Sequence, residues 1–277
     1  MYRRWGLTLV MGGAIYGQDV PAPANKSDSV TPSTPAPTPT PRHWESSASL
    51  NLTATSGNSE SLLFGGSILA KGKWDRNELG LGADLTYGQT TTENVSNGQL
   101  LKTKSTSAEN YGSFLQYNRL VWEDRGYLLA HVDGRQDKVA DVLYRFTFSP
   151  GAGYYLIKEK TIEVSAEGGP GIVFEKLKGS PESDYLSLRL AEKAKWTIND
   201  RSRIFQDIEF LPKVDNFNDF VVNGSVKIET DFSKALALGV TFQDTYRSEP
   251  ALIPGTLPEL HRKKNDLKIL AGVTYKF

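Results

Sequence analysis

The side chains that could do chemistry in this chain are charged residues that recur at every second position of alternating segments. Each charge lies opposite a stripe of Leu, Ile, Val and Phe, so strands would collect the charges on one face. Charges on such a face can pair with one another in a buried space, or line a constriction that selects small polar solutes. The charged residues of this face are Lys71, Asp84, Asp133, Arg135, Arg145, Glu163, Glu167, Arg189, Lys193, Asp207, Glu209, Lys227, Glu229, Asp266 and Lys268.

Register estimated from the short turns aligns a subset of these charges on four successive segments, with alternating sign. These residues are Glu167, Lys193, Asp207 and Lys227. The same reasoning places Asp133 across from Arg145. Opposite charges directly across an antiparallel ladder attract each other. The sequence therefore predicts a charge ladder inside a barrel, which either staples and occludes the lumen or forms a narrow selective pore.

One histidine raises the possibility of a barrel enzyme that acts on lipid or peptide. His131 lies in a predicted strand, and its parity turns it inward beside Asp133. Ser149 also faces inward on the next segment, but the estimated register places it some residues from His131. The carboxylates Asp207 and Glu209 share a face and are a second acid–base candidate. Inward histidines and carboxylates more often form hydrogen bonds and ion pairs, so we expect no catalytic residue.

Composition excludes several other classes of protein. Lys and Arg number 32, as do Asp and Glu, so the chain lacks the basic field of a nucleic-acid binder. There is no cysteine and there are three histidines, which argues against disulfides, thiolate chemistry and a metal site. We expect no cofactor. The sequence has no run of eighteen apolar residues, so it predicts no membrane-spanning helix. Strands that cross a membrane need an apolar residue only at every second position.

The alternation begins at His43 and continues to the last residue. We predict about twelve strands, an even number as expected of a bacterial single-chain barrel. Their approximate ranges are 44–54, 61–74, 78–87, 104–119, 126–137, 141–157, 161–176, 184–198, 202–213, 219–231, 234–248 and 264–277.

The connections support an antiparallel transmembrane barrel of the outer-membrane type. Every second connection is short, whereas the alternate set includes the long segments 89–103 and 249–263, which we expect to be external loops. Gly57-Asn58 fits the tight turn of the first hairpin. A soluble, ligand-binding β-barrel is the remaining alternative for this pattern.

The final segment, 267–277, carries an apolar or aromatic residue at every second position. Tyr275 and Phe277 fit the aromatic girdle at a membrane interface, next to the lipid bilayer. We also expect these two residues to be the signal that the barrel-assembly machinery recognises.

Two polar residues conflict with the expected lipid-facing stripe. Glu192 and Gln206 fall on the apolar face of their strands, where a charge is unfavourable. Either a β-bulge re-aims one of them, or this patch meets another subunit. The residues assign no oligomeric state and no solute.

Three regions follow from composition. Residues 1–17 have two arginines and a short apolar core, as in a signal peptide. Residues 18–42 are rich in Pro, Ser and Thr, which predicts an extended periplasmic linker. Residues 43–277 form the predicted barrel, in the outer membrane of a Gram-negative cell.

Residues 44–277 resemble the YdiY-type salt-induced outer-membrane proteins, a family with a domain of unknown function. The residues that carry the resemblance are Trp44 with Thr55-Ser56-Gly57-Asn58-Ser59, then Asp141, Arg145, Gly151, Gly153 and Tyr154, and finally Tyr246, Pro250, Asp266, Tyr275 and Phe277. The resemblance implies an outer-membrane barrel with a link to salt or osmotic stress. It offers no established catalytic residues, and the Pro/Thr-rich segment departs from the shorter forms of the family.

Overall fold

The computed structural model describes residues 43–55, 59–96, 99–253 and 260–277. The predicted signal peptide, the predicted linker and the Gly57-Asn58 turn lie outside the described residues.

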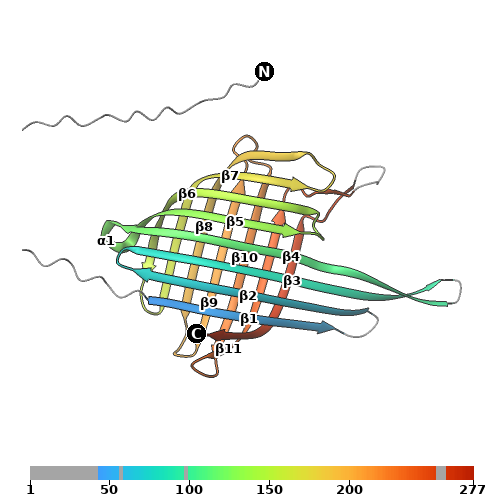
Figure 1. Cartoon of the computed structure of the whole chain (residues 1–277), viewed down its shortest axis with the longest axis horizontal. Coiled ribbons are helices and arrows are strands. Elements are labelled where there is room, and N and C mark those ends of the chain that lie inside the picture. The colour runs from blue at the N-terminus through green and yellow to red at the C-terminus, as the bar shows by residue number, and fades with distance from the viewer. Residues whose placement is uncertain (1–42, 56–58, 97–98, 254–259) are drawn as a thin grey trace, which may run out of the picture. The chain divides into compact units, whose positions relative to one another are not determined.

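Twelve antiparallel strands close into a barrel in which each strand pairs with its neighbours along the chain (Figure 1). The barrel strands are β1 (His43–Thr55), β2 (Ser59–Trp74), β3 (Asn77–Ser96), β4 (Gln99–Val121), β5 (Gly126–Asp137), β6 (Val142–Lys158), β7 (Ile162–Leu177), β8 (Glu182–Thr197), β9 (Ser202–Pro212), β10 (Phe220–Asp231), β11 (Leu236–Arg247) and β14 (Asn265–Lys276). A separate two-stranded sheet pairs β12 (Leu252–Ile253) with β13 (Leu260–His261). The predicted fold class and strand number are confirmed.

The barrel is closed by pairing the first strand with the last. Leu50 on β1 lies opposite Val273 on β14, and the backbone of Ser46 exchanges hydrogen bonds of 3.2 and 3.0 Å with that of Phe277. Closure leaves no free strand edge in the ring. The backbone N–H and C=O groups of every strand therefore find partners on neighbouring strands, since lipid offers none.

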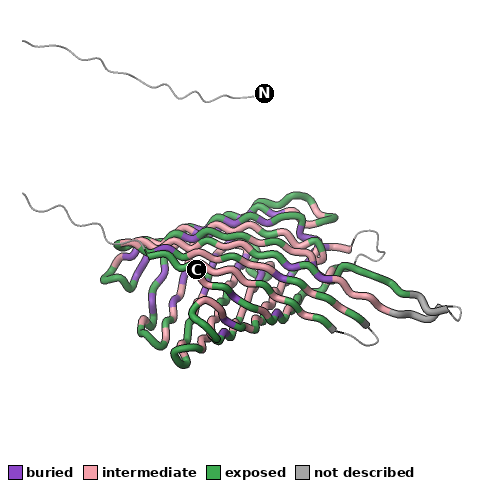
Figure 2. Tube along the Cα trace, turned by 60° about the horizontal axis from the view of Figure 1, so that its bottom comes forward, coloured by how far each residue is buried: buried purple, intermediate pink, exposed green. Residues whose placement is uncertain are grey.

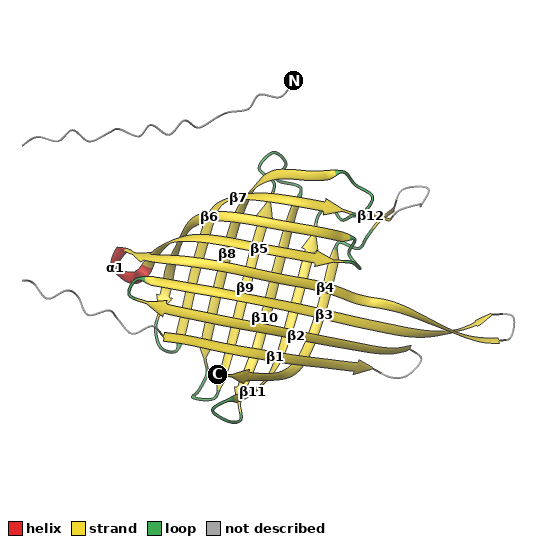
Figure 3. Cartoon of the chain, viewed as in Figure 1, coloured by secondary structure: helices red, strands yellow, loops and turns green. Residues whose placement is uncertain are grey.

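The two ends of the barrel differ, as the sequence predicts. One end, here the short-turn end, carries residues 75–76, 159–161, 198–201 and 232–235 and a single helical turn, α1 (Trp122–Arg125) (Figure 3). The other end, the long-loop end, carries the connections from β5 to β6, β7 to β8, β9 to β10 and β11 to β14.

The described residues of segment 89–103 are strand and not irregular loop, so the prediction was wrong about their secondary structure. β3 and β4 continue through it as a long hairpin that projects beyond the other strands (Figure 1), with Thr92 opposite Thr103. The run Thr90-Thr91-Thr92 contains β-branched residues that favour extended backbone, but it has no apolar alternation. A prediction based on alternation therefore missed this part of the strand.

The two faces of the wall have opposite chemistry, and burial alternates along the strands (Figure 2). Outward side chains are large and apolar, and Leu50 and Leu267 are more than 60% exposed. Inward side chains include buried charged residues such as Arg145, Glu167 and Arg189. A soluble ligand-binding barrel requires the reverse distribution, with a dry apolar interior, so that alternative is wrong.

An apolar cluster fills the interior near the short-turn end. Leu120, Tyr127, Leu129 and Tyr155 are buried together, and the rings of Tyr127 and Tyr155 lie 5.2 Å apart. Gly153 makes this packing possible, because a Cβ at its position would lie only 2.3 Å from the Tyr127 ring. The cluster closes the β4–β6 side of the interior at this end.

Candidate functional site

Glu167 on β7 is the centre of a polar network inside the barrel. Its carboxylate accepts hydrogen bonds from Gln116 Nε2 at 2.7 Å and Tyr127 Oη at 3.0 Å. It also accepts from Arg189 Nη1 at 2.8 Å and Lys193 Nζ at 3.0 Å. The Glu167 side chain is 1% exposed, so its charge is stable there only because these donors replace water.

The network continues along the wall through Arg189 on β8. Its Nε donates to Glu209 on β9 at 2.6 Å, and Asn223 on β10 donates to the same carboxylate at 3.1 Å. Arg189 therefore lies between two carboxylates, a geometry that a planar guanidinium suits better than an ammonium group.

Gln116 carries the network across the lumen. It lies on β4, three strands from Glu167 in the barrel order, and its Oε1 accepts from Lys193 Nζ at 2.8 Å. A second bridge joins Tyr155 Oη on β6 to Glu78 on β3 at 2.9 Å. These contacts join strands that lie three or four positions apart in the ring, so side chains occupy the β4–β8 part of the interior.

Two further charge clusters lie toward the long-loop end. Arg145 Nη2 and Arg247 Nη1 each lie 2.6 Å from the Glu175 carboxylate, and Arg247 reaches it from β11. Asp141, which is 2% exposed, accepts from Arg262 Nε at 2.6 Å, and Lys178 Nζ lies 3.5 Å away. Arg262 follows β13 and Asp141 precedes β6, so this pair ties the connection after β11 to the opposite wall.

The expected charge ladder differs from the observed arrangement. Glu167 and Lys193 form an ion pair, and Lys193 lies directly opposite Asp207. Asp207, however, lies opposite Ser225, and Lys227 instead lies 2.6 Å from Glu229. The estimate failed because it counted from the short turns, whereas β9 and β10 are joined by a longer connection whose length did not fix their register.

The predicted pairing of Asp133 with Arg145 is also wrong. Asp133 lies opposite Thr147, and Arg145 lies opposite Arg135. A register shift between Arg135 and Asp137 accounts for one residue of the two-residue offset, since a bulge near the turn moves every pair that follows. The carboxylate nearest Arg145 is that of Glu175 on the other neighbouring strand.

The catalytic candidates lie closer together than the sequence estimate suggested. Ser149 is directly opposite His131, which corrects the expected separation. The imidazole is already engaged, however: its Nδ1 lies 3.2 Å from Gln116 Oε1 and its Nε2 lies 3.6 Å from Asp133 Oδ1. With both nitrogens facing acceptors, His131 has no lone pair directed at the Ser149 hydroxyl.

The second acid–base candidate, Asp207 with Glu209, is divided between different partners. Glu209 is bound by Arg189 and Asn223, while Asp207 faces Lys193. The ion pair with Arg189 accounts for Glu209, and Asp207 lies opposite a lysine and not beside a base. Among the residues that the structure describes, no group of three or more His, Cys, Asp or Glu side chains could hold a metal ion.

Several inward side chains remain exposed inside the barrel. Lys71 on β2, Asp84 on β3 and Asp207 on β9 share the inward parity, yet all three are exposed. Phe114 on β4 also points inward, stacks on His131 and is 37% exposed. A side chain that points into a closed barrel and remains accessible must face an interior space that water can enter.

The lipid-facing outlier is an isolated polar pair. Glu192 and Gln206 both point outward, and Gln206 Nε2 donates to Glu192 Oε2 at 3.4 Å. Pairing of β8 with β9 is continuous from Leu190 to Thr197, so a bulge does not re-aim either residue. That alternative from the sequence is therefore wrong.

Several lumenal residues were not singled out from the sequence. Gln116, Tyr127, Tyr155 and Arg247 all take part in contacts that join strands or cross the lumen. Inward parity was the available signal for each of them. Their partners lie several strands away, and neither alternation nor turn length encodes a distance across the barrel.

A closed antiparallel barrel with an exposed apolar exterior and a charged interior is a transmembrane β-barrel of the Gram-negative outer-membrane type. Within the described residues, no helix is long and apolar enough to cross a membrane.

The chain belongs to the family "Protein of unknown function, DUF481", whose model matches residues 48–277. This is the family of the YdiY-type proteins, so the resemblance drawn from the sequence is confirmed. No curated protein matches the chain.

Solved structures with a similar fold are outer-membrane barrels. An outer membrane channel from Pseudomonas putida F1 is 12% identical, with a TM-score of 0.47 over 90% of this chain and 100% of that one. The NanC porin is 8% identical, with a TM-score of 0.44 over 83% and 96% of the two chains. The KdgM porin in complex with oligogalacturonate is 8% identical, with a TM-score of 0.43 over 84% and 99%.

Proposed function

We propose that this protein is a narrow passive channel for small polar solutes, and that it is not an enzyme. The observation that carries the proposal is the set of exposed inward residues, Lys71, Asp84, Asp207 and Phe114, inside a closed barrel. The packed network around Glu167 narrows the lumen but leaves these side chains accessible. They carry both signs of charge, which favours polar solutes over a strong preference for either ion type.

The competing function is a purely structural barrel with an occluded lumen. A barrel of twelve strands lies between eight-stranded barrels, whose interiors are filled, and large water-filled porins, so strand number alone does not decide. A link to salt or osmotic stress rests on the family resemblance, and a channel that equilibrates small ions is compatible with it.

Conductance measurements in planar bilayers test the channel. We expect small unitary currents from the wild-type barrel, and a changed ion preference when Lys71 is replaced by Gln. Removal of one positive charge from a narrow lumen should change its ion preference by about 1 kcal/mol, or roughly fivefold in relative anion permeability. Lys160, in the turn before β7, provides a matched control, because Lys160→Gln removes the same charge from an exposed position outside the lumen. Absence of unitary current above bare-membrane leak would exclude the channel and leave the structural function.

We further propose that the closing strand is the contact for the barrel-assembly machinery. Tyr275 and Phe277 on and after β14 stack with ring centroids 5.7 Å apart, and both are more than half exposed on the outer wall. Phe277→Ala should lower the amount of assembled barrel in cells several-fold, measured by heat-modifiable gel migration. Phe232→Ala is the matched control, since Phe232 is also exposed at the short-turn end. Equal loss in both variants would indicate a general effect of the aromatic girdle and contradict the signal.

A further inference from the structure

The outer wall of β8 and β9 carries a carboxylate and an amide where its neighbours are apolar. Glu192 lies between Leu190 and Ala194 on the outward face, and Gln206 lies between Ile204 and Ile208. Trp196, four residues beyond Glu192 toward the short turns, is 53% exposed and fits the aromatic girdle. Glu192 is therefore displaced from the girdle into the apolar band, by a distance of roughly 10 Å for four residues of a tilted strand.

The hydrogen bond between these two side chains satisfies only part of their polar groups. The 3.4 Å contact uses one N–H of Gln206 and one oxygen of Glu192. Within the described chain neither side chain makes another hydrogen bond, so one carboxylate oxygen, one N–H and the amide oxygen have no protein partner. In hydrocarbon, unsatisfied polar groups are unfavourable, and ionisable residues there are commonly covered by another protein surface.

A second copy of the same surface has the groups that would complete these hydrogen bonds. When two copies meet about a two-fold axis, Gln206 of each copy can donate to Glu192 of the other, because the surface is complementary to itself. Lipid tails offer no donor or acceptor. The pairing needs close approach of the two walls, which small outward residues allow.

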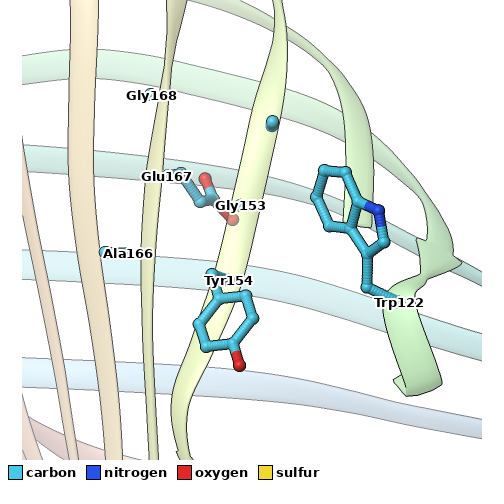
Figure 4. A pocket seen from close by; sticks show the side chains of 7 residues that line it. Trp122, Gly153, Tyr154, Ala166, Glu167 and Gly168 are labelled. Carbon is cyan, nitrogen blue, oxygen red and sulfur yellow. The ribbon is translucent and has the colours of Figure 1, made fainter. Parts of the chain in front are cut away.

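The adjoining part of the outer wall has the shape that such an approach requires. A shallow groove of about 300 Å³ on the neighbouring strands is bordered by Ala152, Ala166, Gly168, Tyr154 and Trp122, and Figure 4 shows it from close by. Ala166 is the register partner of Glu192, so the groove begins on the next strand. Tyr154 and Trp122 are large and exposed, whereas the groove floor consists of small residues, which leaves room for an apolar side chain of the other copy.

We propose that the outer face from β6 to β9, centred on Glu192 and Gln206, is the contact surface between two copies of this chain in the membrane. Reciprocal hydrogen bonds between Gln206 and Glu192 fix the orientation of the two barrels, and the groove receives an apolar side chain of the second copy.

Cysteine cross-linking of the full chain in isolated outer membranes tests this interface. The chain has no cysteine, so a single introduced thiol reports one position. Ala194→Cys places the thiol on β8 beside the polar pair, and Ala70→Cys places a matched thiol on the outer face of β2, six strands away around the ring. On oxidation we expect a shift to the mass of a dimer for the β8 thiol and none for the β2 thiol.

A second variant tests whether cross-linking depends on the Glu192–Gln206 pair or only on two barrels lying near each other. Ala194→Cys combined with Glu192→Leu and Gln206→Leu should lose the cross-linked dimer. The barrel itself should remain assembled in this variant, because leucine suits a lipid-facing position, and heat-modifiable migration checks this directly.

Four outcomes would overturn the proposal: no cross-linked dimer from the β8 thiol, equal cross-linking from both thiols, an adduct whose mass corresponds to a different protein, or a dimer that survives both leucine substitutions. The first and last of these would mean that the polar pair faces lipid or is incidental to contact. The second would mean random collision, and the third a partner other than this chain.

Discussion

Replacing Glu167 with alanine is expected to lower the free energy of unfolding by about 3–5 kcal/mol, the usual cost of leaving buried charges without their partner. Arg189 and Lys193 would lose a carboxylate at 2.8 and 3.0 Å. The side chains of Gln116 and Tyr127 would each lose an acceptor as well. Glu167 is the common acceptor of four donors, so its removal should have one of the largest effects on stability among single substitutions in the lumen. Equilibrium unfolding in denaturant from lipid vesicles measures it.

Two further variants determine whether charge is the cause. Glu163→Ala makes the same change on the same strand, at an exposed inward position near the short turns, and should cost less than about 1 kcal/mol. Glu167→Gln keeps the volume but removes the charge, so it should retain most of the loss seen with alanine. A glutamine variant as stable as the wild type would show that packing around Glu167, and not charge compensation, stabilises the wall.

The dyad pattern of the sequence was sufficient to predict the architecture. Leu267, Ile269 and Val273 recur at odd positions of a strand whose other face carries Lys268 and Thr274, and a strand with two such faces needs two different environments. Repetition of this pattern with short turns at every second connection leaves a closed barrel as the arrangement that gives each face its environment. Strand number, closure and the inward position of the charged residues therefore follow from local information.

The partners of the inward residues do not follow from local information. Parity places Asp133 and Arg145 in the lumen, but one bulge between Arg135 and Asp137 changes which residues face each other. Contacts across the lumen are harder still to predict from the sequence. Gln116 and Glu167, for example, are 51 residues apart and lie on strands that do not pair. Their proximity depends on the curvature of the whole ring.

The outward pair shows the value of residues that break the pattern. Glu192 and Gln206 interrupt runs of apolar outward residues on β8 and β9, and the sequence left two explanations open. Continuous pairing of β8 with β9 removes one of them, because a bulge would have interrupted the register. Polar residues that remain on the lipid-facing side of a strand in the folded barrel can be explained by a contact with another protein surface.

Asp141→Asn is expected to release the connection after β11 from the opposite wall. Asp141 has a φ of 55°, in the left-handed region that asparagine tolerates as well as aspartate, so the backbone turn should persist. The charge-assisted bond from Arg262 and the attraction of Lys178 would be weakened. A loss of about 1–2 kcal/mol raises the population of the detached segment roughly 5- to 30-fold.

Limited digestion by trypsin, added to the long-loop side of the barrel in proteoliposomes, measures this release. Cleavage at Arg262, Lys263 and Lys264 should accelerate by the same factor, because proteolysis of a locally opened segment follows its population when closing is fast. Asp215→Asn is the matched control, since Asp215 is an exposed loop residue at the same end of the barrel. Unchanged cleavage in Asp141→Asn would mean that backbone contacts hold the segment, among them the 2.8 Å bond from the Arg262 amide to the Ala251 carbonyl. The ion pair would then contribute little, as exposed pairs usually do, despite the burial of its carboxylate.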